Sequence, residues 1–186
     1  MVIPELQETS DALRASIAEL GSGKRVLVPS TSGFDGIKLQ KMNHDVIVLA
    51  TTTEDFEKLK AWEEKNLTSP IKNLELRGES FFKSKECADV IWDYAYLASL
   101  DPSLHELWGQ AVERIVRGTG LVAIHLWPPG TAHRSLSIDQ VSSIIGKYGF
   151  NPVKKIKVNN DIDSKVVIWQ RLHSNAVVEN MTATYK

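Results

Sequence analysis

Acidic and aromatic residues follow one strongly apolar segment of this 186-residue sequence. The run at residues 88–92 is followed by Asp93, Tyr94 and Tyr96. A carboxylate at the end of a strand can orient a polar ligand, and neighbouring tyrosines can form the wall of its pocket. The structural alternative is that Asp93 caps the next turn while the tyrosines pack in the core. The residue types alone leave both interpretations open.

Small polar residues follow the first two apolar segments. Residues 25–29 end in proline, and Ser30, Ser32 and Gly33 lie in the turn that comes next. This turn is not a phosphate-binding loop, because it lacks the Gly-Lys-Ser/Thr ending that such loops require. Thr51 begins a run of three threonines after the second segment, where a helix cap is a more common role than ligand binding.

A further group of candidates follows the apolar segment at residues 121–126. Trp127 stands beside two prolines and can line the mouth of a pocket. His133 and Arg134 lie on the same loop, within reach of that pocket. His125 lies inside the apolar run, so we expect a buried histidine there rather than a ligand.

Hydrophobic periodicity predicts the elements that position these residues. Apolar runs predict strands at residues 25–29, 46–50, 71–76, 88–92, 121–126, 153–158 and 165–172. Apolar residues at helical spacing predict helices at residues 6–20, 35–42, 56–62, 104–116 and 137–147. Strands that alternate with helices form a parallel sheet with helices on both faces, and ligands bind at the carboxyl ends of its strands.

The last two predicted strands are joined by a short polar turn at residues 159–163. This turn is too short for a helical crossover, so the pair must be antiparallel. A mostly parallel seven-stranded α/β sheet that ends in an antiparallel hairpin is typical of the Rossmann-like methyltransferase fold. We expect one such domain at residues 1–174 and a frayed tail at residues 175–186.

Four stretches resemble the thiopurine and thiol methyltransferase family. Residues 88–108 read ADVIWDYAYLASLDPSLHELW, close to the family pattern DLIYDYTFLCALxPxLRxxW. Residues 23–29 are similar to the family's first strand, residues 78–82 to its Gly-Asp-Phe-Phe segment, and residues 117–121 to its Pro-Gly-Gly-x-Leu segment. The resemblance covers nearly the whole chain, from about residue 4 to residue 172.

The resemblance implies an S-adenosylmethionine-dependent transfer of a methyl group to a small thiol or another soft nucleophile by in-line displacement. It assigns catalysis to Asp93 and Tyr94. The cofactor-binding residues that it implies are Ser30, Ser32, Gly33, Thr51, Glu79 and Asp93, and the substrate-pocket residues are Tyr96, Trp127, His133 and Arg134.

The sequence departs from the family at two cofactor positions. Ser30 and Ser32 replace glycines of the first turn, where a Cβ can fill space that the ligand needs. Ala50 replaces the acid that accepts hydrogen bonds from the ribose, and Glu54 lies several residues too late to substitute directly. Two alternatives therefore stay open: a partner or regulatory subunit that no longer binds the cofactor, and an isomerase or cyclase that works without it.

Composition limits the remaining classes. A net charge of −1, with acids and bases interspersed, argues against nucleic-acid binding. We expect no membrane span and no secretory signal, hence a cytoplasmic protein. Cys87 is the sole cysteine, which excludes an intrachain disulfide and a cysteine-built metal site; we expect no metal and a packed thiol. Expected partners are a small-molecule substrate and either a second copy or an intact methyltransferase.

Overall fold

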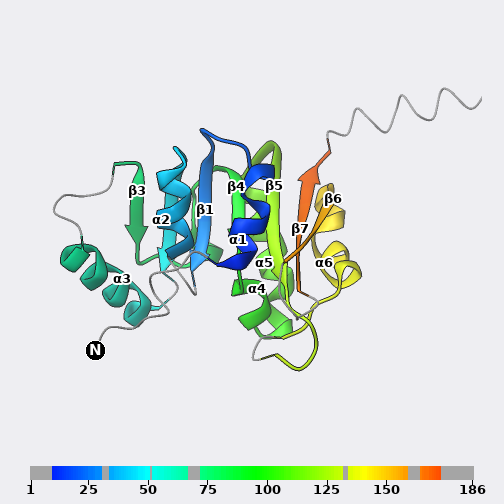
Figure 1. Ribbon diagram of the computed structural model, residues 1–186. Coiled ribbons are helices and arrows are strands. Elements are labelled where there is room, and N and C mark those ends of the chain that lie inside the picture. The colour runs from blue at the N-terminus through cyan, green and yellow to red at the C-terminus, as the bar shows by residue number, and fades with distance from the viewer. Residues whose placement is uncertain are drawn as a thin grey trace, which may run out of the picture.

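A computed structural model describes the chain at residues 10–30, 34–50, 52–66, 72–131, 134–158 and 164–172. The strands form one seven-stranded sheet with the order β3-β2-β1-β4-β5-β7-β6 (Figure 1). The first five strands in this order are parallel, and β7 is antiparallel to both β5 and β6. The antiparallel β6–β7 pair was predicted. The strands are β1 (Arg25–Ser30), β2 (Asp45–Ala50), β3 (Leu74–Arg77), β4 (Ala88–Asp93), β5 (Val116–Leu126), β6 (Phe150–Lys157) and β7 (Lys165–Arg171).

Helices cover both faces of the sheet, which confirms the predicted layers. Side chains from α1 (Asp11–Ser16), α2 (Phe34–Lys41) and α3 (Thr53–Asn66) pack on one face, called the α1 face below. Side chains from α4 (Tyr96–Ser99), α5 (His105–Ile115) and α6 (Ile138–Ile145) pack on the other, called the α5 face. Because side chains alternate along a strand, each strand supplies both faces.

Local capping explains where several helices begin and end. The hydroxyl of Ser10 accepts a hydrogen bond from the backbone N–H of Leu13 at 3.1 Å, so Ser10 caps α1. Ser137 caps α6 through a reciprocal capping box with Gln140, as its place before an apolar periodic run predicts. Gly149 ends the following turn at φ 82°, a conformation that favours glycine.

A glycine brings α2 close to the sheet. A Cβ built on Gly36 would lie 2.5 Å from Cγ2 of Val48 on β2, so only glycine fits at this contact. Because α2 follows β1 in the chain, it begins near the carboxyl end of that strand.

The structure differs from the sequence predictions at several points. β5 begins at Val116, directly after α5, whereas periodicity predicted a start at residue 121. The short helix α4 was not predicted, because one turn carries too little periodicity to detect. Cys87 is exposed rather than packed, since it lies before the first buried residue of β4.

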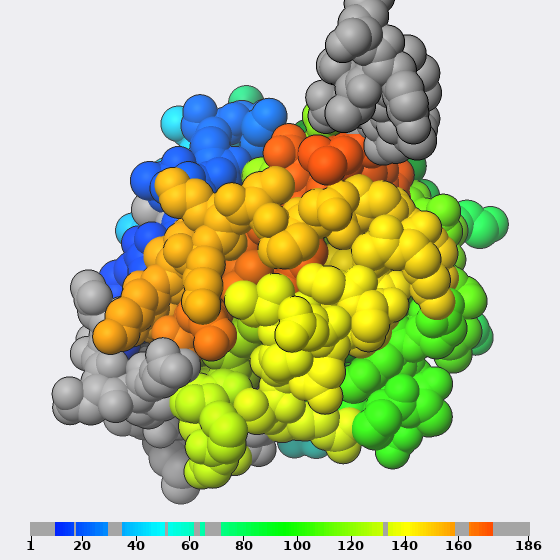
Figure 2. Space-filling model, turned by 90° about the vertical axis from the view of Figure 1, so that its right-hand side faces the viewer, coloured from blue at the N-terminus to red at the C-terminus, as the bar shows by residue number. Residues whose placement is uncertain are grey.

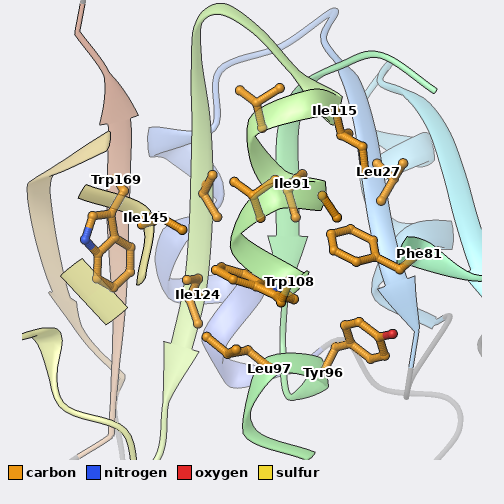
Figure 3. Close-up of a cluster of buried hydrophobic side chains, with 14 of the residues drawn as sticks. Leu27, Phe81, Ile91, Tyr96, Leu97, Trp108, Ile115, Ile124, Ile145 and Trp169 are labelled. Atoms are coloured by element: carbon orange, nitrogen blue, oxygen red, sulfur yellow. The ribbon is translucent and has the colours of Figure 1, made fainter. Parts of the chain in front are cut away.

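The larger core cluster lies on the α5 face (Figure 3). Trp108 of α5 stands at its centre and is fully buried against β4 and β5. At the flank of the molecule, α6 and the edge strand β6 form the surface (Figure 2). Within the described residues, no helix has the length and apolar character needed to cross a membrane.

Candidate functional site

Four strand-end residues form a row at the carboxyl edge of the sheet, called the edge row below. Ser30 is paired with Ala50 in the β1–β2 register. Continuing the β1–β4 register places Tyr94 next to Ser30, and continuing the β4–β5 register places His125 next to Tyr94. Ala50 belongs to the buried cluster on the α1 face and Tyr94 packs against it. Ala50 and Tyr94 therefore lie on the α1 face.

Tyr94 and Trp127, two of the predicted site residues, contact each other. The indole N–H of Trp127 donates a 3.3 Å hydrogen bond to the carbonyl oxygen of Tyr94, and their ring centroids are 5.4 Å apart. The ring of His125 lies 4.2 Å from that of Trp127 and 5.2 Å from that of Tyr94. His125 is buried, as predicted, while the other two rings are half-buried. Together they form an aromatic surface at the ends of β4 and β5, a grouping that sequence analysis did not predict for His125.

Asp35 is a second residue that sequence analysis missed. Its carboxylate is buried and accepts hydrogen bonds from the backbone N–H of Ser10 at 3.0 Å, the hydroxyl of Ser10 at 2.7 Å and the indole N–H of Trp92 at 2.9 Å. Burial raises the pKa of Asp35, although the hydrogen bonds from Ser10 and Trp92 lower it. Asp35 thus joins α1, α2 and β4 beneath the edge row. An acid in the first turn of a helix is common, so the sequence carried no distinctive signal.

Tyr94 lies close enough to this carboxylate to respond to its charge. Burial raises the pKa of Tyr94, and the negative charges of Asp35 and Asp11 raise it further. The phenol therefore stays protonated at neutral pH and can act as a hydrogen-bond donor.

Asp93 holds the backbone of the following helix. Its fully buried carboxylate accepts hydrogen bonds from the backbone N–H groups of Tyr96 at 2.8 Å and Leu97 at 3.1 Å, and from the indole N–H of Trp108 at 3.2 Å. Burial raises the pKa of Asp93 to about 7, against the lowering effect of these bonds. In this structure Asp93 points toward the α5 face, and its contacts are those of a capping residue.

Tyr96 does not join Tyr94. It lies in the core cluster of the α5 face with its ring centroid 5.5 Å from that of Phe81 and 6.2 Å from that of Phe82 (Figure 3). Burial raises the pKa of Tyr96 to about 12, and the charge of Asp93 adds to this effect. The two tyrosines are separated because β4 ends at Asp93 and the chain turns into α4.

The remaining predicted residues are more dispersed. Glu79 follows β3, and its carboxylate is 4.0 Å from the guanidinium of Arg77. Arg134 donates a 3.2 Å hydrogen bond to the carbonyl oxygen of Leu100, at the end of α4. The backbone of Ser30 is part of β1. The predicted site residues that lie outside the described residues are Ser32, Gly33, Thr51 and His133, together with the side chain of Ser30.

No protein-family model matches the sequence, and no curated protein is significantly similar to it. Many solved structures share the fold. The 1,6-didemethyltoxoflavin-N1-methyltransferase of Burkholderia thailandensis, solved with S-adenosylhomocysteine, is 15% identical with a TM-score of 0.68, over 91% of this chain and 82% of that one.

Two further structures agree with this likeness. A TehB-like S-adenosylmethionine-dependent methyltransferase of Corynebacterium glutamicum is 14% identical with a TM-score of 0.69, over 89% of each chain. The N-methyltransferase NodS of Bradyrhizobium japonicum, solved with S-adenosylhomocysteine, is 12% identical with a TM-score of 0.67, over 91% of this chain and 92% of that one. The chain therefore has the Rossmann-like fold of class I methyltransferases.

Proposed function

We propose that this chain is an S-adenosylmethionine-dependent methyltransferase that acts on a small molecule with a soft nucleophile, most simply a thiol. The observation that supports this most strongly is the aromatic surface of Tyr94 and Trp127 at the ends of β4 and β5, next to the end of β1. In this type of sheet, ligands bind at the carboxyl ends of the strands. The cofactors named for the similar structures, and the sequence resemblance to thiol methyltransferases, point to the same chemistry.

The residues at this edge fit the cofactor in part. Ala50 offers the ribose no acceptor, and Glu54 is already paired with Lys58 at 2.6 Å. Glu79 is half-buried, follows the strand next to β2 and contacts Arg77 only at 4.0 Å. Glu79 therefore has carboxylate oxygens available to accept the ribose hydroxyls at this edge.

The chain's own contribution to the reaction is positional. When bound, S-adenosylmethionine would supply an electrophilic methyl group. The rings of Tyr94 and Trp127 exclude water from the acceptor and fix its approach, while Asp35 holds the first turn of α2 in place. Transfer to sulfur needs little proton transfer from the protein, so orientation provides most of the rate enhancement.

Calorimetry with S-adenosylhomocysteine tests the proposal. The full chain should bind it, and the substitutions Tyr94→Ala and Glu79→Gln should each weaken binding by about tenfold, the loss expected for one good polar or aromatic contact. Tyr148→Ala, at a tyrosine after α6, is the matched control and should bind like the parent chain. Absence of binding at millimolar ligand would contradict the proposal.

A second candidate is a methyltransferase-like partner subunit that no longer binds the cofactor. Ala50 favours it, because this side chain is buried among apolar residues and supplies no hydrogen-bonding group. In that case calorimetry shows no binding, and size-exclusion chromatography of the folded chain shows assembly with an intact methyltransferase.

A further inference from the structure

A cavity opens far from the edge row, at the amino edge of the sheet. It measures about 400 Å³, within the range of small-molecule sites. Its walls come from Lys24 before β1, Asp89 at the start of β4, residues 117–120 of β5, and Gln170 of β7. Because parallel strands β1 and β4 separate the two ends of the sheet, this cavity is distinct from the proposed methyl-transfer site.

A bulge in β5 builds one wall of this cavity. Ala88 pairs with Val116, but Val90 pairs with Leu121, so β5 uses three more residues than β4 over the same interval. The extra residues leave the ladder and turn outward. A Cβ on Gly120 would lie 2.6 Å from the carbonyl oxygen of Asp89, so glycine is required for this close approach. Gln170 braces the bulge through a 3.2 Å hydrogen bond from its Nε2 to the carbonyl oxygen of Thr119.

The charged side chains that line the cavity are two cations, Lys24 and Arg117, and one acid, Asp89. Asp89 uses one carboxylate oxygen to accept from the backbone N–H of Arg25 at 2.9 Å and the other to accept from Arg117 at 3.1 Å. The guanidinium of Arg117 has further N–H groups and is half-exposed. Within the described part of the chain, the Lys24 ammonium contacts no carboxylate. The cavity therefore holds two cations, and its single acid is already engaged.

We propose that this cavity binds a small molecule through an oxyanion, a phosphate or carboxylate group held between Lys24 and Arg117. Arginine offers a forked pair of donors to such groups and lysine a mobile point charge, which together suit an anion of more than one charge. The volume admits a phosphorylated or polycarboxylic metabolite rather than a bare ion alone. This assignment does not depend on methyl transfer.

Calorimetric titration of the full chain with pyrophosphate and with citrate, at constant ionic strength, tests the proposal. Saturable binding of either probe is expected, and the stronger probe identifies the phosphate or the carboxylate as the preferred group. Lys24→Gln and Arg117→Gln should each weaken binding by about tenfold or more, because each removes a charge-assisted contact. Lys60→Gln, at an exposed lysine of α3 outside the cavity, is the charge-matched control and should leave binding unchanged.

Two results would overturn the proposal. One is no saturable binding of either probe; the other is equal binding by the parent chain and both cavity variants. If Arg117 only stabilises the bulge through its ion pair with Asp89, Arg117→Gln lowers the melting temperature while anion binding is absent or unaltered. Tyr94→Ala should not change anion binding, so failure of the methyl-transfer proposal and failure of this one are distinguishable.

Discussion

The indole N–H of Trp108 donates a hydrogen bond to the carboxylate of Asp93 at 3.2 Å and so joins the end of β4 to α5. This carboxylate is fully buried, and three of its four hydrogen bonds come from the backbone of α4. Because the Asp93 carboxyl is buried and joins these elements, its protonation state affects the stability of the fold.

We expect Asp93 to make the chain less stable as the pH rises from about 4 to about 7. The folded chain holds a proton up to a pKa of about 7, whereas the unfolded carboxyl releases it near 3.8. Between these values rising pH favours the unfolded state. Urea unfolding of the parent chain and of Asp93→Asn tests this. As the pH rises over this interval, the free energy of unfolding of the parent chain should fall steadily relative to that of Asp93→Asn. A difference that is constant with pH would show that Asp93 does not carry the effect.

Asp35→Ala should lower the free energy of unfolding by about 2–4 kcal/mol, because it leaves buried donors of Ser10 and Trp92 without an acceptor. Asp35→Asn keeps one carbonyl oxygen and should cost less. Denaturant unfolding measures both. In the Ser10→Ala background the penalty of Asp35→Ala should be smaller, because the hydroxyl donor is already absent. If the penalties of the two substitutions simply add in the double variant, the hydrogen bond from the Ser10 hydroxyl contributes nothing to stability.

Ala50→Asp should tighten binding of S-adenosylhomocysteine by about tenfold, because it returns a charged acceptor to the end of β2. Ala50→Asn is the uncharged control and should gain less. Calorimetry measures the affinity, and circular dichroism checks that the buried substitution still allows folding. A folded Ala50→Asp chain with no gain in affinity would mean that the ribose does not lie at this strand end.

Gly36→Ala should destabilise the chain by about 1–3 kcal/mol through overpacking, despite the better helix propensity of alanine. The new methyl group would meet Val48 at 2.5 Å. In the Val48→Ala background the space exists, so the same change should become neutral or stabilising. Thermal unfolding of the parent chain, the two single variants and the double variant measures this. A penalty of Gly36→Ala that persists in the Val48→Ala background would contradict overpacking.

Lys157→Gln should stabilise the chain by about 0.2–1 kcal/mol, because Lys157 stands directly opposite Lys165 in the β6–β7 pair. The gain should decrease in high salt, which screens the repulsion. Lys154→Gln is the matched control on the opposite face of β6, where Lys154 is paired with Glu19 at 2.7 Å. Equal effects of the two substitutions on the free energy of unfolding would contradict this electrostatic reason.

The sequence alone determined the layers, the mostly parallel sheet and its antiparallel terminal pair. Apolar runs and helical spacing are local patterns, so they predicted the strands, and the shortness of residues 159–163 predicted the antiparallel pair of β6 and β7. Capping is local too, which is why the start of α6 at Ser137 could be predicted. Because Tyr94 and Trp127 each follow a parallel strand, the sequence also predicts that they lie at the same edge of the sheet.

Only the tertiary structure decided which faces the site residues use. Tyr94 and Tyr96 would share a face if β4 continued, but the chain turns into α4 after Asp93, and the two rings lie on opposite faces of the sheet. Asp35 is hydrogen-bonded to Ser10, which lies 25 positions away in the chain, and to Trp92, which lies 57 positions away. Such contacts depend on how α1 and α2 pack over β4, and long-range packing leaves no periodic signal in the residues themselves.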